Sequence, residues 1–157
     1  MKEKKTIVAV SGGFDPLHRG HIRYLRAAKN LGDELVVILN TDEFLKKKKG
    51  YLFMPYKERK EILQSITYVD RVVRCIDKDQ TVAKTLELVR PHVFAKGGDR
   101  TIENIPDAER EICQKWGIKL VFGVGGRKIQ SSSWLIKKLA DQLCGQSDVA
   151  EVHDKKP

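Results

Sequence analysis

Two glycines and two histidines stand close together near the amino terminus, in residues 11–21, SGGFDPLHRGH. This stretch follows the apolar run 7–10 directly, and its glycines let backbone N–H groups approach an anion. His18 and His21 are three residues apart, so both rings lie on one face or on the leading turn of the helix expected next. Gly20 between them leaves room for a ligand. Because the start of a helix attracts negative charge, the pattern predicts a phosphate site.

The same residue types have simpler explanations that the spacing alone leaves open. Polar residues at this point could just cap a helix. A histidine pair can also bind a metal ion, although no third ligand is evident nearby in the sequence.

The hydrophobic pattern predicts strands that alternate with helices. Short apolar runs predict strands at 6–10, 34–40, 71–75, 92–95 and 118–122. Helical spacing, with glycine or proline at the ends, predicts helices at 18–30, 56–66, 81–89, 107–116 and 131–144. The segment 41–54 shows no clear period and contains four consecutive lysines, so we expect a mobile loop there.

Alternating strands and helices predict a single-domain, Rossmann-like α/β fold. We expect a parallel sheet of about five strands with helices on both faces, formed by residues 1–144. The polar segment 145–157 is expected to be a disordered tail. Parallel sheets bind ligands beyond the carboxyl ends of their strands, and three motifs fall there: 11–21, KGGD at 96–99 and GVGGRKIQSSS at 123–133.

Composition limits the kind of protein and of partner. A chain of 157 residues fits one domain, and its formal charge of +9 favours anionic partners. The three cysteines are widely separated without a C-x-x-C pair, which favours a reducing cytoplasm over a disulfide framework. We expect neither a membrane span nor a signal peptide. A nucleic-acid partner is not expected, since interleaved aromatic residues are missing.

The string 11–21 resembles the G-x-F-D-x-x-H-x-G-H signature of the cytidylyltransferase-like nucleotidyltransferases. This group includes glycerol-3-phosphate cytidylyltransferase and the heptose-1-phosphate adenylyltransferases. The segments TDEF, PYKERKEIL, KGGD and SSSWLIKKL follow in the order typical of the family, so the resemblance covers residues 6–143.

The resemblance implies roles for the first motif. His18 and His21 match the histidines that contact the nucleotide phosphates and stabilise the transition state. The backbone around Gly13, Phe14 and Asp15 is implied to lie against the nucleotide, and Gly13 stands where many relatives have threonine. Packing for Phe14 and a turn or helix cap for Asp15 are the alternatives.

The lysine segment and the helix after it also match family positions. Lys46, Lys49 and Gly50 reproduce the K-x-x-K-G pattern of the heptose enzymes, which implies a catalytic lid, whereas the glycerol-phosphate enzymes align on Lys48. Arg59 matches an arginine that binds the acceptor phosphate. A solvated loop and a solvated helix arginine are the alternatives.

The later motifs are implied to complete the nucleotide site. Gly97 and Asp99 of KGGD match the positions that face the ribose or the substrate, although simple turn formation would also explain the glycines. Ser131 and Ser132 match the hydroxyls that start the last helix, where one could merely serve as a cap. Arg127 lies near the arginine of the cytidylyltransferase motif R-T-E-G-I-S-T, but the spacing differs by about one residue and T-E-G is absent.

These residues suit nucleotidyl transfer to a phosphate. A phosphate monoester is mostly dianionic at neutral pH and needs no general base, so donors and cations would carry the catalysis. We expect transfer from CTP or ATP to a phosphorylated sugar, polyol or small alcohol, with release of pyrophosphate, Mg²⁺ on the triphosphate and a homodimer. The alternatives are a catalytically silent nucleotide-binding regulatory module and a nucleic-acid-binding protein.

Overall fold

The computed structural model of the chain describes residues 3–153, and within them the strands alternate with helices as the sequence predicts. The strands are β1 (Ile7–Gly12), β2 (Glu34–Leu39), β3 (Arg71–Arg74), β4 (Val93–Gly97) and β5 (Lys119–Val124). The helices are α1 (Arg19–Lys29), α2 (Asp42–Lys49), α3 (Tyr56–Gln64), α4 (Ala83–Val89), α5 (Asp107–Trp116) and α6 (Ser132–His153).

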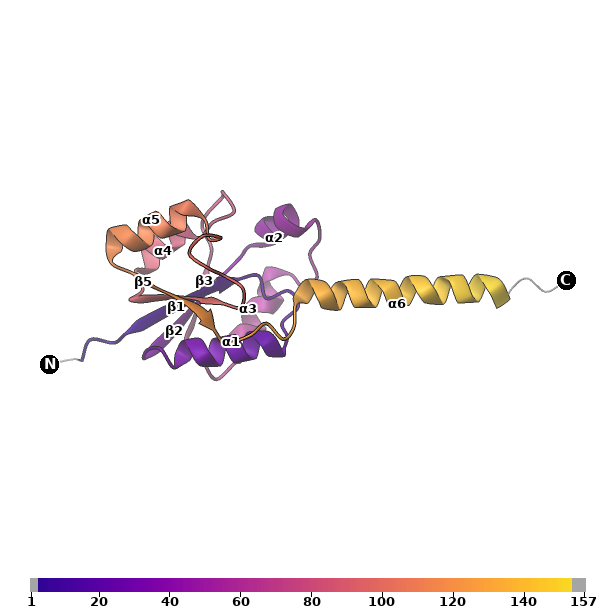
Figure 1. Ribbon diagram of the computed structural model, residues 1–157, viewed down its shortest axis with the longest axis horizontal. Helices are drawn as coiled ribbons and strands as arrows, with labels where there is room; N and C mark the ends of the chain where they lie inside the picture. Colours follow the sequence, from indigo (N-terminus) through magenta and orange to yellow (C-terminus); the bar gives the residue numbers. More distant parts are fainter. Residues whose placement is uncertain (1–2, 154–157) are drawn as a thin grey trace.

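All the strands pair in parallel, in the order β3-β2-β1-β4-β5. β1 lies in the middle, where Val8 is paired with Leu35 of β2 on one side and with Val93 of β4 on the other. The chain therefore builds outward from β1 in one direction and then crosses to the other side of it. The gap between the carboxyl ends of β1 and β4 is the topological switch point, where sheets of this kind bind ligands (Figure 1).

Alternate residues of each central strand face opposite sides of the sheet and form two cores. Val8 and Val10 of β1 pack with Leu25 of α1 and Leu63 of α3. Ala9 lies between them in sequence and faces the other core, where α4 and α5 contribute further apolar side chains. Two buried faces explain why the strands are continuous apolar runs. The predicted Rossmann-like fold with helices on both faces is confirmed.

The expectation of a mobile loop at 41–54 was wrong, because residues 42–49 form helix α2. The Thr41 hydroxyl accepts a hydrogen bond of 3.1 Å from the N–H of Phe44, which caps the start of the helix. Gly50 ends it with a φ of 82°, a conformation that glycine adopts at little cost. Phe44 and Leu45 are the buried residues of α2 and hold this helix against the rest of the domain.

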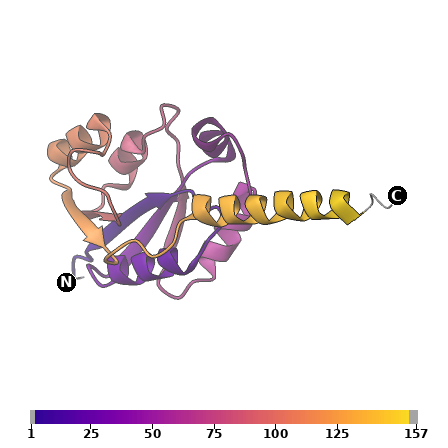
Figure 2. The same ribbon diagram turned by 45° about the vertical axis from the view of Figure 1, so that its right-hand side comes forward.

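Helix α6 is longer than the sequence predicts and continues to His153, through most of the segment expected to be a disordered tail. Residues 154–157 of that segment lie outside the described residues. Figures 1 and 2 show α6 projecting away from the sheet in both views. Leu139 of α6 is accordingly 47% exposed.

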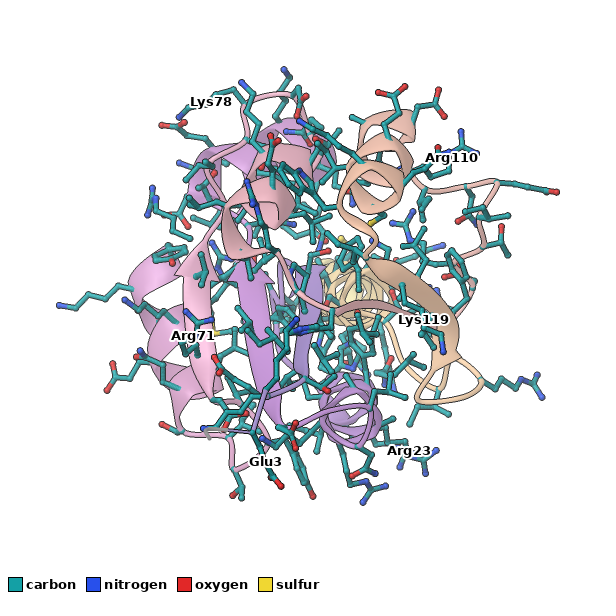
Figure 3. The ribbon with its side chains drawn as sticks, turned by 90° about the vertical axis from the view of Figure 1, so that its left-hand side faces the viewer. Glu3, Arg23, Arg71, Lys78, Arg110 and Lys119 are labelled. Carbon is teal, nitrogen blue, oxygen red and sulfur yellow. The ribbon has the colours of Figure 1, made fainter. Side chains whose placement is uncertain are left out.

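The end of the sheet where the strands begin carries charged side chains. Figure 3 looks onto the amino ends of the strands, where Arg71 begins β3 and Lys119 begins β5. Over residues 3–153, no helix combines the length and the apolar character that crossing a membrane would require.

Candidate active site

A cavity of about 860 Å³ opens at the carboxyl ends of β1, β4 and β5. The three sequence motifs converge on it, as their positions after parallel strands predict. The predicted site residues that line it are Gly13, Phe14, His18, His21, Lys49, Gly97, Asp99, Arg127, Ser131 and Ser132. Asp15, Lys46 and Arg59 were also predicted for the site but do not line the cavity.

The two histidines cap the amino terminus of α1 reciprocally. The N–H of Gly20 donates to Nδ1 of His18 over 3.1 Å, and the N–H of His18 donates to Nδ1 of His21 over 3.2 Å. The two rings stack with centroids 3.8 Å apart. The capping explanation and the phosphate-site explanation are therefore compatible, because the capping bonds use only one nitrogen of each ring.

These hydrogen bonds fix the tautomer of both neutral rings. Since each Nδ1 accepts a hydrogen bond, the proton of each neutral imidazole lies on Nε2, which can donate to a ligand. Burial lowers the pKa of His21 to about 3, helped by the charges of His18 and Lys49. Burial also lowers the pKa of His18, together with the charges of Lys128 and Lys49. At neutral pH, the site therefore holds two uncharged imidazole donors.

Glycine is required beside the histidines for a steric reason. A Cβ at Gly20 would lie 2.9 Å from Cε1 of His18, so the missing side chain makes room for that ring rather than directly for a ligand. A Cβ at Gly13 would lie 2.5 Å from Cδ2 of Leu45 in α2. Gly13 stands at a position where many relatives have threonine. The missing side chain therefore lets α2 pack closely over the first motif.

Helix α2 divides the four consecutive lysines between the cavity and the solvent. Lys48 and Lys49 line the cavity, whereas Lys46 and Lys47 do not. Successive helical residues differ by about 100° in direction, so four in a row cannot share one face. Lys46, which was predicted as a catalytic residue, therefore does not reach the cavity, whereas Lys49 and Lys48, the residue on which the glycerol-phosphate enzymes align, do.

Arg59 is buried and has a structural role, and its side chain does not line this cavity. Its guanidinium is 1% exposed and donates to the carbonyl oxygens of Met54, Gly13 and Asn40 over 2.8–2.9 Å. It also pairs with Asp42 at the start of α2 over 2.7 Å. With its donors used in this way, Arg59 joins the first motif to α2 and α3, so the predicted contact with an acceptor phosphate does not fit its position.

Asp15 is likewise buried and structural. Its carboxylate accepts hydrogen bonds from the backbone N–H groups of Phe53 and Met54, over 2.8 and 2.6 Å. It therefore anchors the segment between α2 and α3 to the first motif, which is the turn-type role that the sequence left open.

The start of α6 brings hydroxyl groups to the cavity. Ser131 is its N-cap residue and accepts the N–H of Leu135 with its carbonyl oxygen, and Ser132 donates its hydroxyl to the carbonyl oxygen of Pro16 over 2.8 Å. The latter bond ties α6 to the first motif. Arg127 and Lys128 from the preceding loop also line the cavity.

Several residues that line the cavity were not among the predicted site residues. Tyr24 of α1 donates its hydroxyl to the carbonyl oxygen of Ala95, and a Cβ at Gly97 or Gly125 would lie 3.0 Å from atoms of Tyr24. Tyr24 therefore positions the ends of β4 and β5, and its spacing of four residues from the buried Ala28 was the available signal. The charged residues that were missed are Arg23, Lys96, Arg100, Glu103, Glu109 and Lys128.

A cavity lined by several lysines and arginines, at the switch point of a five-stranded parallel sheet, defines a Rossmann-like, nucleotide-binding α/β protein. Residues 9–139 match the cytidylyltransferase-like family, and the chain belongs to it. The suspected resemblance to cytidylyltransferase-like nucleotidyltransferases is confirmed.

Individual relatives are consistent with this membership. The chain is 39% identical over 139 residues to the bifunctional protein HldE of Citrifermentans bemidjiense, covering 86% of this chain and 27% of that protein. It is 42% identical over 103 residues to the FAD synthase of Pyrococcus horikoshii, covering 64% of this chain and 68% of that protein. The chain thus spans about a quarter of the length of the bifunctional relative.

Among solved structures, the lipopolysaccharide core biosynthesis protein of Thermoplasma volcanium aligns with a TM-score of 0.63 and 30% identity. The alignment covers 82% of this chain and 99% of that chain.

Proposed function

We propose that the protein transfers a nucleoside monophosphate from a nucleoside triphosphate to the phosphate of a small phosphate monoester. The observation that carries this proposal is the pair of neutral imidazole donors at the start of α1, facing a cavity that Lys49 and Lys128 also line. Family membership supports the same class of reaction.

In the proposed step, an oxygen of the acceptor phosphate attacks the α-phosphorus of the triphosphate. A new oxygen–phosphorus bond forms, and the bond from the α-phosphorus to the bridging oxygen breaks. Pyrophosphate leaves with that electron pair. The acceptor is already ionised near neutral pH, so no residue has to remove a proton.

The chain's own contribution is positioning and charge stabilisation. The Nε2–H groups of His18 and His21 would donate to phosphate oxygens that gain charge in the transition state. Lys49 from α2 and Lys128 from the loop before α6 would bind the β- and γ-phosphates. Fixed donors of this kind are each worth about 10²–10³ in rate when they face the developing charge.

Mg²⁺ is proposed to enter with the nucleotide. Over residues 3–153 there is no group of three or more His, Cys, Asp or Glu side chains arranged to hold a metal ion. A cavity with few carboxylates still fits Mg²⁺, because this ion is commonly bound through substrate phosphates, water and few protein ligands. When bound, the ion would neutralise part of the triphosphate charge.

ATP is the nucleotide that we propose first. The name of the FAD synthase relative implies formation of an adenylyl–phosphate linkage, and the KGGD and K-x-x-K-G patterns resemble the heptose-type adenylyl enzymes. The absence of T-E-G beside Arg127 weakens the case for CTP. A sugar phosphate or polyol phosphate is the proposed acceptor class.

A pyrophosphate-release screen tests this function. Four nucleoside triphosphates are each combined with sugar, polyol and amino-alcohol phosphates, and the best pair is repeated with His18→Ala and His21→Ala. We expect release that requires both substrates and falls at least 100-fold in each variant. Full activity in both variants would contradict the assigned chemistry. Nucleotide binding without release for any pair would favour the regulatory module.

A further inference from the structure

Most of the charged residues that line the cavity come from two places in the fold: the start of α1 with the loop before α6, and the end of β4 with the loop that follows it. His18 and His21 are influenced by Lys49, and His18 also by Lys128. Lys48 and Lys96 are both influenced by Arg100 and Glu109, and Lys48 also by Lys49, its neighbour in α2. We name Lys48, Lys96 and Arg100 the second cationic group. Lys96 is in β4 near its carboxyl end and lies beside Glu109 of α5, whereas Arg100 follows β4 and Lys48 comes from α2.

Lys96 is the buried member of this group and has donors to spare. Its side chain is 11% exposed and lines the cavity, with Nζ 3.5 Å from Oε2 of Glu109. This separation is long for a hydrogen bond, and among the described residues Lys96 makes no shorter one. Burial lowers its pKa, an effect that the Glu109 carboxylate opposes. The ammonium group also lies 4.6 Å from the centroid of the Phe94 ring, so a bound oxyanion would add hydrogen bonds that neither neighbour fully supplies.

Glu109 positions this lysine without using up its donors. Oε1 of Glu109 accepts the backbone N–H of Val82 over 3.2 Å, which fixes the carboxylate between α5 and the start of α4. Oε2 is buried and accepts no hydrogen bond within the described part of the chain. One carboxylate thus holds Lys96 beside the cavity.

Lys48 and Arg100 add positive charge to the same region. Burial lowers the pKa of Lys48, and the charges of Arg100, Lys49 and Lys96 lower it further. The Arg100 guanidinium makes one long contact, 3.4 Å from Nη1 to the carbonyl oxygen of Asn104. These cations repel one another, and an anion bound between them would offset the repulsion.

Carboxylates do not cancel this charge over the whole cavity. The carboxylates that line it are Asp99, Glu103 and Glu109, whereas the cationic side chains are Arg23, Lys48, Lys49, Lys96, Arg100, Arg127 and Lys128. The excess of cations leaves capacity for more than one phosphate-bearing molecule.

We propose that the second cationic group binds the phosphate of the acceptor, with Lys96 and Arg100 as its principal ligands and Glu109 as the residue that positions Lys96. This rests on the proposed function, in which two anionic reactants have to be held at once. Lys48 and Lys49 are neighbours at the end of α2, so the two groups adjoin. The acceptor phosphate would therefore lie next to the triphosphate, and Arg59, buried elsewhere, takes no part.

The test measures phosphate binding directly. The full chain is saturated with α,β-methylene ATP, which occupies the nucleotide site without reacting, and inorganic phosphate is then titrated by calorimetry. The variants are Lys96→Met and Arg100→Met, and the matched control is Lys119→Met at the opposite end of the sheet. Arg100 is exposed and outside any helix or strand, so its variant retains the fold even if Lys96→Met does not.

We expect one phosphate to bind the nucleotide-saturated protein, at least tenfold more weakly in Arg100→Met and in folded Lys96→Met, and within twofold of normal in Lys119→Met. The affinity for the nucleotide analogue should stay within threefold in every variant. Absence of phosphate binding beside the analogue, or unchanged binding in Arg100→Met, would overturn the proposal. A failed pyrophosphate-release screen would reject the proposed function instead, and this titration would still give its own answer.

Discussion

His21 couples the candidate chemistry to the stability of the fold. Its ring is partly buried with the Nδ1 used as a helix cap, and its pKa of about 3 lies well below the ordinary value near 6.5. The unfolded chain therefore binds a proton at this residue that the folded chain rejects. Stability from this group is complete above pH 6.5 and is lost as the pH falls from 6.5 toward 3.

We predict that His21→Asn reduces the acid sensitivity of folding. The free energy of unfolding should fall by about 2 kcal/mol less between pH 7 and pH 5 in the variant than in the natural chain, because Asn takes up no proton. Urea unfolding at both pH values measures the difference. Equal pH dependence in the two proteins would show that His21 is not held neutral by the fold.

A second prediction concerns Gly20, because a side chain introduced at this position would occupy the space of the His18 ring. Gly20→Ala should lower the rate of pyrophosphate release at least tenfold by displacing that ring. The free energy of unfolding should change by less than about 1 kcal/mol, since alanine favours the helix. Gly145→Ala is the control, because a Cβ there meets no atom within 4 Å. A normal rate in Gly20→Ala would refute the assigned role of the His18 ring.

At the residue scale, the sequence predicted which residues line the cavity better than it predicted their hydrogen-bond and ion-pair partners. The histidines, the glycines and the serines of the last helix could be predicted because each follows a strand or starts a helix. Arg59 could not be placed, because its burial depends on three carbonyl groups from separate segments. The pairing of Lys96 with Glu109 was also beyond reach, since it depends on how α5 crosses the end of β4.

At the scale of elements, α2 is the clearest difference between the sequence prediction and the structure. Its boundaries were readable in principle: Thr41 precedes two acidic residues, and Gly50 follows the lysines. The run of like charges was interpreted as a solvated loop, whereas in the helix these lysines lie beside the carbonyl groups of its carboxyl end. This correction decides which lysines can reach a ligand.

Helix α2 predicts different effects for two lysines three residues apart. Lys49→Met should lower the rate of pyrophosphate release at least tenfold, because Lys49 lines the cavity. Lys46→Met removes the same charge from the same helix and should stay within twofold of the natural rate. Steady-state kinetics with the best substrate pair compares them directly. Equal losses would indicate a general effect of helix charge rather than a contact with the nucleotide.

At the scale of the whole molecule, the fold was largely predictable because the strands are apolar runs of a length that only a sheet covered on both faces can bury. Once parallel strands are accepted, their carboxyl ends have to meet, and the motifs that follow β1, β4 and β5 share one cavity. The projection of α6 was not predictable, since its apolar spacing is equally typical of a helix packed on the core. The homodimer stays a prediction.

The central claim is that this cavity joins two phosphates and releases pyrophosphate. Its most direct test is ³¹P NMR of the protein incubated with ATP, Mg²⁺ and the acceptor that performs best in the screen. The account predicts equal amounts of pyrophosphate and of a new diphosphate ester, seen as two mutually coupled phosphorus signals, and neither of them with His18→Ala. Formation of ADP with inorganic phosphate, and no diphosphate ester, would contradict it.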